Sequence, residues 1–204
     1  MGLFGEITEK PWEHRGVLDG ALSSEDTLPD ASRIALYFFL MVVTALFLLF
    51  GFAYFLRMEL ADWRPLPEPN LLWFNTLVLV FASVALQWTT GVVSQSRSNL
   101  VLLGLLLSGV FTAAFLVGQV YAWQLLIDQG YYLSSNPANS FFYLITGLHG
   151  LHVLGGMFVW AWVMFNMVRG VEVSEVLTSL KLCATYWHFL LLLWIVLFYS
   201  LLST

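Results

Sequence analysis

Residues Thr146 to Gly156 read T-G-L-H-G-L-H-V-L-G-G, within a run of 40 residues (Gln129 to Val168) that contains no Asp, Glu, Lys or Arg. A helix needs about 20 apolar residues to cross a bilayer, and only helices or closed barrels can cross it. The run therefore predicts a membrane-spanning helix that contains two histidines, His149 and His152. Polar groups at that depth usually face protein, a cavity or a ligand, so we look for function here first.

The rest of the chain repeats this pattern of uncharged runs. Of its 204 residues, 59% are hydrophobic and 10% are charged, against about 25% charged in soluble domains. Each of five runs is long enough for one helix, and their continuity excludes barrel strands. The predicted fold is all-α, an integral membrane bundle with spans of about 34–56, 71–93, 99–127, 141–168 and 180–202.

The charges predict an orientation. With the N-terminus in the cytoplasm, the inner segments carry six Lys or Arg and the outer segments carry only Arg57 and Arg64, as the positive-inside rule requires. Five spans then put the C-terminus in the periplasm of a bacterial cytoplasmic (inner) membrane, in a multi-pass protein. We expect residues 1–33 to form a polar acidic arm without a signal peptide, before a membrane domain of residues 34–204.

Charged residues fall outside the predicted spans or at their edges. Pumps and ion-coupled transporters usually need acids or bases inside the membrane, so independent ion translocation is disfavoured. Seven of the thirteen acidic residues lie in the first 30 residues, and this acidity argues against nucleic-acid binding. The single cysteine, Cys183, can neither form an internal disulfide nor bind a metal alone.

His149 and His152 lie about 60° apart around a helix, so one face can carry both. They are either ligands of a haem or metal, or neutral imidazoles that hydrogen-bond to a neighbouring helix. A haem between helices needs an opposing histidine, and only His188, in Y-W-H-F-L-L-L-L-W, is at hand. Gly147, Gly150, Gly155 and Gly156 surround the pair, and small residues allow a helix to approach closely. We therefore favour packing roles for all three histidines.

Together, T-G-L-H-G-L-H-V-L-G-G and Y-W-H-F-L-L-L-L-W resemble subunit III of the haem–copper oxidases, in its short five-helix form. The resemblance covers the chain from about Ser32 to its end. It implies a non-catalytic subunit that packs against and stabilises subunit I, and that holds phospholipids in a cleft near the oxygen route. The partner complex would reduce oxygen to water with proton translocation.

The resemblance implies no catalytic, cofactor-binding or metal-binding residue in this chain, and it places haem and copper in the partner subunits. It leaves open whether cytochrome c or quinol donates the electrons. The residues that match the family motifs, or flank them, become candidates for a structural motif or a subunit interface. These candidates are Gly147, His149, Gly150, His152, Trp187 and His188.

The chain departs from the family pattern at three acidic positions. Leu191 stands where an Asp is common, Ala122 stands in place of another frequent acid, and Val42 and Val43 occupy the place of a third. These differences put a role in proton delivery in doubt. They also keep a second hypothesis within the family, an accessory subunit of nitric oxide reduction.

Two alternatives come from other classes of protein. A stand-alone transporter or channel could line its pore with glutamines, although the uncharged spans argue against ion coupling. A b-type haem protein would use His149 or His152 together with His188.

Overall fold

The computed structural model describes residues 31–67, 69–93 and 98–203. These residues form five α-helices, each long and apolar enough to cross a membrane. They are α3 (Ala31–Met58), α4 (Leu71–Val93), α5 (Ser98–Asp128), α6 (Pro137–Val168) and α7 (Val173–Leu202). The predicted all-α fold is thereby confirmed. Most of the predicted arm, residues 1–30, lies outside the described residues, and the contacts below all lie within Leu36–Thr204.

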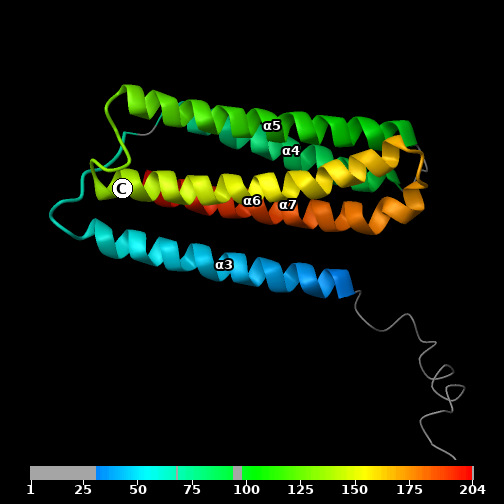
Figure 1. The fold of residues 1–204 in the computed structure, drawn as a ribbon, viewed down its shortest axis with the longest axis horizontal. Helices are drawn as coiled ribbons and strands as arrows, with labels where there is room; N and C mark the ends of the chain where they lie inside the picture. The colour runs from blue at the N-terminus through cyan, green and yellow to red at the C-terminus, as the bar shows by residue number, and fades with distance from the viewer. Residues whose placement is uncertain (1–30, 68, 94–97, 204) are drawn as a thin grey trace, which may run out of the picture. The chain divides into compact units, whose positions relative to one another are not determined.

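Four of the helices form one closely packed group, which we call the four-helix group: α4, α5, α6 and α7. Consecutive helices in it run antiparallel (Figure 1). Helix α4 packs on α5 and α7, and α6 packs on the same two helices. Helix α3 runs alongside α6 and α7 (Figure 1), with Phe39 and Phe47 against His152 of α6. The four-helix group therefore holds the centre, and α3 lies beside it.

Helix α6 begins four residues earlier than the predicted span, at Pro137 rather than Phe141. Asn136 is its N-cap, because the Asn136 side chain accepts a hydrogen bond from the Ala138 N–H at 3.2 Å. Asn before Pro is a favourable helix start, since the side chain satisfies a free N–H and proline lacks one. Hydropathy alone hides this start, because its first residues are polar.

Helices α5 and α6 end at glycines in the left-handed region, Gly130 (φ 87°) and Gly170 (φ 80°). At each end, the residue after the glycine donates its N–H to the carbonyl five residues earlier. Tyr131 donates to Leu126, and Val171 donates to Asn166. This geometry satisfies carbonyls that the helix end leaves free, and glycine adopts it without steric cost.

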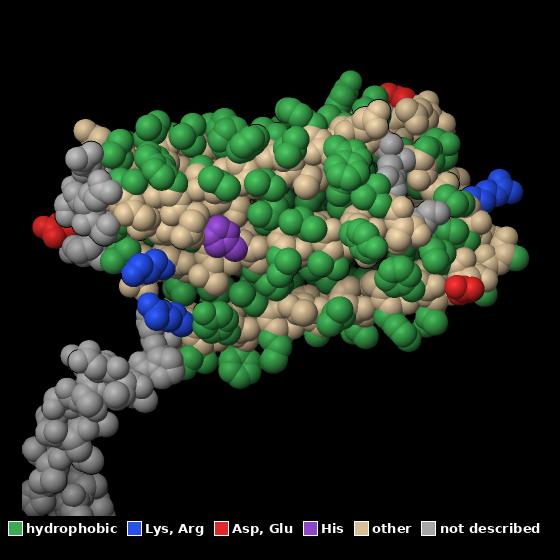
Figure 2. Space-filling view, turned by 180° about the vertical axis from the view of Figure 1, so that it is seen from behind, with side chains coloured by type: hydrophobic (Ala, Val, Ile, Leu, Met, Phe, Trp, Pro, Cys, Tyr) green, Lys and Arg blue, Asp and Glu red, His purple; other side chains and the backbone are tan. Residues whose placement is uncertain are grey.

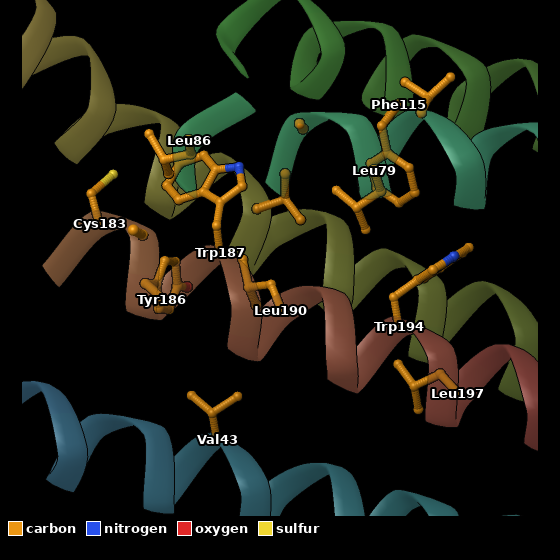
Figure 3. Packing of buried hydrophobic residues seen from close by; sticks show 14 of the residues in the cluster. Val43, Leu79, Leu86, Phe115, Cys183, Tyr186, Trp187, Leu190, Trp194 and Leu197 are labelled. Atoms are coloured by element: carbon orange, nitrogen blue, oxygen red, sulfur yellow. The ribbon is translucent and has the colours of Figure 1, made fainter. Parts of the chain in front are cut away.

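Large side chains fill the centre of the four-helix group. Trp187, Trp194 and Phe115 are among the largest side chains that are fully buried. Figure 3 shows Phe115 of α5 and Trp194 of α7 pointing toward each other, and their ring centroids lie 5.1 Å apart. Val43 points from α3 toward α7 in the same view (Figure 3). In a membrane, such close van der Waals packing is a main source of helix association.

The surface follows the division between lipid and water. Figure 2 shows hydrophobic side chains over the middle of one face, with acidic and basic side chains gathered at its two ends. Exposed Phe, Leu, Val and Trp side chains occur on all five helices. A soluble protein rarely exposes so much contiguous apolar surface, so this distribution fits a chain surrounded by lipid.

Candidate functional site

His149 lies at the centre of the four-helix group and is 0% exposed. Its ring packs against Trp194 of α7 (centroids 5.0 Å apart) and edge-on against Phe115 of α5 (5.8 Å). Among the described residues, neither of its ring nitrogens has a hydrogen-bond partner. The burial also puts His149 beyond the direct reach of a partner subunit.

His152, one turn further along α6, faces α3 instead. Its Nδ1 lies 2.7 Å from the carbonyl oxygen of Leu148, so Nδ1–H donates to its own helix. Phe47 meets the imidazole edge-on with centroids 5.6 Å apart, and Phe39 lies at 6.3 Å. The His152 carbonyl also accepts a hydrogen bond from the Tyr186 hydroxyl at 2.9 Å. His152 therefore joins α3, α6 and α7.

His188 lies on the side of α7 that faces α4, and its side chain is exposed. Its Nε2 lies 2.8 Å from Gln87 Oε1, so Nε2–H donates to the amide oxygen. This tautomer leaves Nδ1 to accept from the Ser83 hydroxyl. The three membrane histidines thus face three different places, which argues against the haem alternative.

A ligand set for a metal is also missing from the part of the chain that the structure describes, where no three His, Cys, Asp or Glu side chains come together. Cys183 is buried and free. The positions without the family acids are apolar too: Val43 is 2% exposed and Ala122 is 0% exposed. Val43 and Ala122 therefore bring no charged side chain into this interior.

The glycines near the histidines do two different things. A Cβ on Gly156 would lie 2.7 Å from Tyr186 Cε1 and 2.9 Å from Trp187 Cζ3, so this glycine permits close packing of α6 on α7. A Cβ on Gly150 would meet no described atom within 4 Å, and one on Gly147 would make only ordinary contact with Trp123. Close packing of α6 on α7 thus depends on Gly156, and Gly150 opens onto free space.

That space is a groove between α5 and α6 with a volume of about 640 Å³. Its walls are mainly apolar, with Leu116 and Leu151 among the residues that line it. Gln119 also lines the groove and is 2% exposed, and both atoms of its amide lack a hydrogen-bond partner among the described residues. The groove thus has a buried, unused polar group in its wall.

Four tryptophans hold the four-helix group together, and sequence reasoning had recognised only Trp187 among them. Each indole N–H donates to a hydroxyl on another helix: Trp123 to Thr146 (3.1 Å), Trp160 to Ser108 (3.2 Å), Trp187 to Thr112 (3.1 Å) and Trp194 to Thr76 (2.9 Å). A buried indole N–H usually finds such a partner. The feature of the sequence that could have identified these residues is the position of a tryptophan inside a predicted span rather than at its ends.

One ion pair lies where α3 ends. Arg57 donates from Nη1 to Asp62 Oδ1 at 2.7 Å and from Nη2 to the second carboxylate oxygen. These hydrogen bonds hold the pKa of the Asp62 carboxyl below its usual value. Since the pair is exposed to solvent, it contributes little to stability.

Comparisons with known proteins give a consistent result. The model of the family described as "Cytochrome c oxidase subunit III" matches residues 11–203. A protein of Mycobacterium leprae (strain TN), named "Probable cytochrome c oxidase subunit 3", is 33% identical over 143 residues, which are 67% of this chain and 68% of the relative.

Two further relatives carry similar names. The "Probable cytochrome c oxidase subunit 3" of Mycobacterium tuberculosis (strain ATCC 25618 / H37Rv) is 31% identical over 159 residues, covering 74% of this chain and 76% of the relative. The "Cytochrome c oxidase subunit 3" of Corynebacterium diphtheriae (strain ATCC 700971 / NCTC 13129 / Biotype gravis) is 30% identical over 128 residues, covering 62% of each chain.

Proposed function

This chain belongs to the cytochrome c oxidase subunit III family, and we propose that it works as a non-catalytic subunit III that stabilises subunit I. As a member of this family it is a multi-pass membrane protein of a respiratory terminal oxidase. The proposed complex reduces oxygen to water with proton translocation, and its haem and copper lie in other subunits. The separation of His149, His152 and His188 onto three different neighbours is the observation that carries the non-catalytic role.

The exposed His188 is our proposed point of contact with subunit I. It is a polar side chain in the middle of α7, hydrogen-bonded to the exposed Gln87 of α4. A polar group at bilayer depth usually faces protein rather than lipid. Gly147 and Gly150, whose open sides face the groove between α5 and α6, remain candidates for a second contact.

Lipid is the second proposed partner. The groove between α5 and α6 has a volume of about 640 Å³, and a smaller one of about 360 Å³ is lined by residues of α3, α6 and α7, including Phe39, Gly155 and Tyr186. Both are mainly apolar and open, which suits the acyl chain of a phospholipid. We propose that such lipids lie along the route by which oxygen reaches the partner.

We also propose an orientation, with the N-terminus in the cytoplasm of a bacterial inner membrane. Arg169 and Lys181 are then on the cytoplasmic side, where basic residues collect. Asp62, Arg64 and the Arg57 guanidinium are on the periplasmic side.

The test is to purify the full chain from its native membrane by a C-terminal tag. We expect a haem-containing partner, a reduced-minus-oxidised haem spectrum and oxygen uptake that depends on the partner. A preparation without haem, or one that turns over nitric oxide but no oxygen, would contradict the proposal.

Two variants sharpen this test. His149→Ala should leave the haem spectrum unchanged, because the ring is enclosed within this chain. His188→Leu should lower the amount of haem partner that co-purifies, whereas Leu192→Ala, at an exposed apolar position on the same helix, should not. A changed haem absorption in His149→Ala, or equal partner yield in both α7 variants, would contradict the assigned roles.

A further inference from the structure

Three buried polar side chains, each from a different helix, lie near contacts between helices of the four-helix group. Asn75 of α4 lies against Gly118 of α5, whose Cβ position the Asn75 amide fills. Gln119 is the next residue, and Phe115, one turn before it, contacts the ring of His149 on α6. Because α4 touches α5 at Gly118 and α6 touches α5 at Phe115, the three side chains are at a similar depth in the group.

Five polar atoms of these three side chains lack a hydrogen-bond partner among the described residues. Among the residues that the structure describes, Asn75 Nδ2, both Gln119 amide atoms and both His149 ring nitrogens have no hydrogen-bond partner. The three side chains are 1%, 2% and 0% exposed, respectively. Neither a partner subunit nor a lipid headgroup can reach a side chain buried to this extent. A buried polar group without a partner is costly, so whatever satisfies these groups is small and internal.

We propose that Asn75, Gln119 and His149 form a binding site for ordered water inside the membrane domain. Water suits the chemistry because it both donates and accepts. A neutral imidazole has one donor and one acceptor, the Gln119 amide has both, and Asn75 Nδ2 is a donor. A buried water typically makes about three hydrogen bonds, and three neutral side chains on three helices can supply them.

The groove between α5 and α6 borders the proposed water site. Gln119 lines this groove as well as being buried, so its side chain lies between the groove and the interior. An acyl chain in the groove would cover this side of Gln119 and keep the water enclosed.

The first test is a map of the native complex near 2 Å resolution, prepared from its own membrane. We expect density for at least one water within hydrogen-bonding distance of both Gln119 and His149. A map in which these side chains are ordered and the space between them is empty would overturn the proposal. The map does not depend on whether the complex reduces oxygen. It can therefore contradict the water site while the proposed function stands, and the reverse also holds.

The second test is a double-mutant cycle with Gln119→Leu and His149→Leu. A single substitution leaves the water and the other side chain short of partners, while the double substitution makes the site apolar throughout. Each single variant should lower the midpoint temperature of unfolding by about 5 °C, and the double variant should lose less than the sum.

The matched control replaces Gln124, an exposed glutamine in the same groove. Gln124→Leu should change the midpoint little and should be additive with His149→Leu. Additive losses for Gln119→Leu and His149→Leu would overturn the shared site. If a single variant does not assemble, the map of the native complex still decides.

Discussion

Helix α3 and the four-helix group are both apolar, yet they are held in different ways. Of the most apolar stretch of α3, 17% is buried in the chain, against 22% to 50% of those of the four-helix group. Rings such as Phe39 and Phe47 make the contacts of α3 with α6. Inside the four-helix group, indoles donate hydrogen bonds from helix to helix, as Trp194 does to Thr76.

The difference reflects what drives association in lipid. Lipid tails are as apolar as the side chains, so burial of leucines against one another gains little, and close packing or interhelical hydrogen bonds must hold helices together. The four-helix group has both kinds of contact. Substitutions in the two regions can therefore separate the stability of the four-helix group from the attachment of α3 to it.

The largest effect is expected at Gly156. Gly156→Leu forces a side chain against Tyr186 and Trp187, which already lie within 3.0 Å of the Cβ position. Overpacking of this kind should cost about 3 kcal/mol and reduce the yield of assembled complex. The adjacent control, Gly155→Leu, meets open space and should assemble normally. Equal yields of the two variants, measured by immunoblot of purified complex, would contradict the packing of α6 on α7.

Next comes Phe47, which is 3% exposed and lies edge-on to His152. Phe47→Ala should weaken the attachment of α3 by about 2 kcal/mol, because the cavity term remains even where lipid replaces water. Limited proteolysis between α3 and α4 should speed up while α4 to α7 stay protected. Phe52→Ala, at a position 66% exposed, is the control. Faster cleavage throughout the chain would show that α3 is integral to the group.

A smaller effect is expected at Thr76. Thr76→Val removes the acceptor of the Trp194 indole and should cost about 1 kcal/mol, as interhelical hydrogen bonds in membranes do. Thermal unfolding in detergent would measure it. Among the described residues, the hydroxyl of Thr90 donates within its own helix, to the carbonyl of Gln87, so Thr90→Val should leave the midpoint unchanged. If both valine variants behave alike, the indole bond contributes nothing measurable.

The smallest effect is expected at Asp62. Because Arg57 lowers the pKa of this carboxyl in the folded state, its contribution is present above the unfolded pKa of about 4 and is lost as pH falls through the folded value. Asp62→Asn should therefore lower the midpoint slightly at pH 7, and the difference should shrink as the pH falls through the folded pKa. Glu59→Gln is the nearby control. A difference that does not shrink as the pH falls would assign the effect to something other than charge.

Hydrophobicity and charge locate the helices along the sequence. The second span is predicted at about 71–93, and helix α4 is Leu71–Val93. The largest difference is at the start of the fifth span, which is predicted at about 180, whereas helix α7 begins at Val173. Hydropathy places only the apolar part of a helix, whereas the backbone hydrogen bonds of α7 continue through polar residues such as the exposed Lys181.

The candidate site was predicted only in part. The two histidines on α6 were expected to share a face, but His149 contacts Trp194 and His152 contacts Phe47. A separation of about 60° is enough to turn two side chains to different neighbours in a crowded bundle. The tryptophan–hydroxyl bonds and the level shared by Asn75 and Gln119 depend on the register between helices. Periodicity within one helix carries no information on that register.

The loop between α3 and α4, which contains Asp62, contacts the start of α6. This contact has a consequence for the order in which the chain is assembled. The Asn136 side chain donates to the carbonyl of Arg64, and Phe141 meets Tyr54 edge-on at 5.8 Å. Since Asn136 is synthesised about seventy residues after Arg64, these contacts at the C-terminal end of α3 cannot form until the start of α6 emerges from the ribosome. We expect nascent chains that stop before residue 136 to be cleaved readily in the first loop, and longer ones to resist. Helix α3 would then stay without these contacts until α6 has been synthesised.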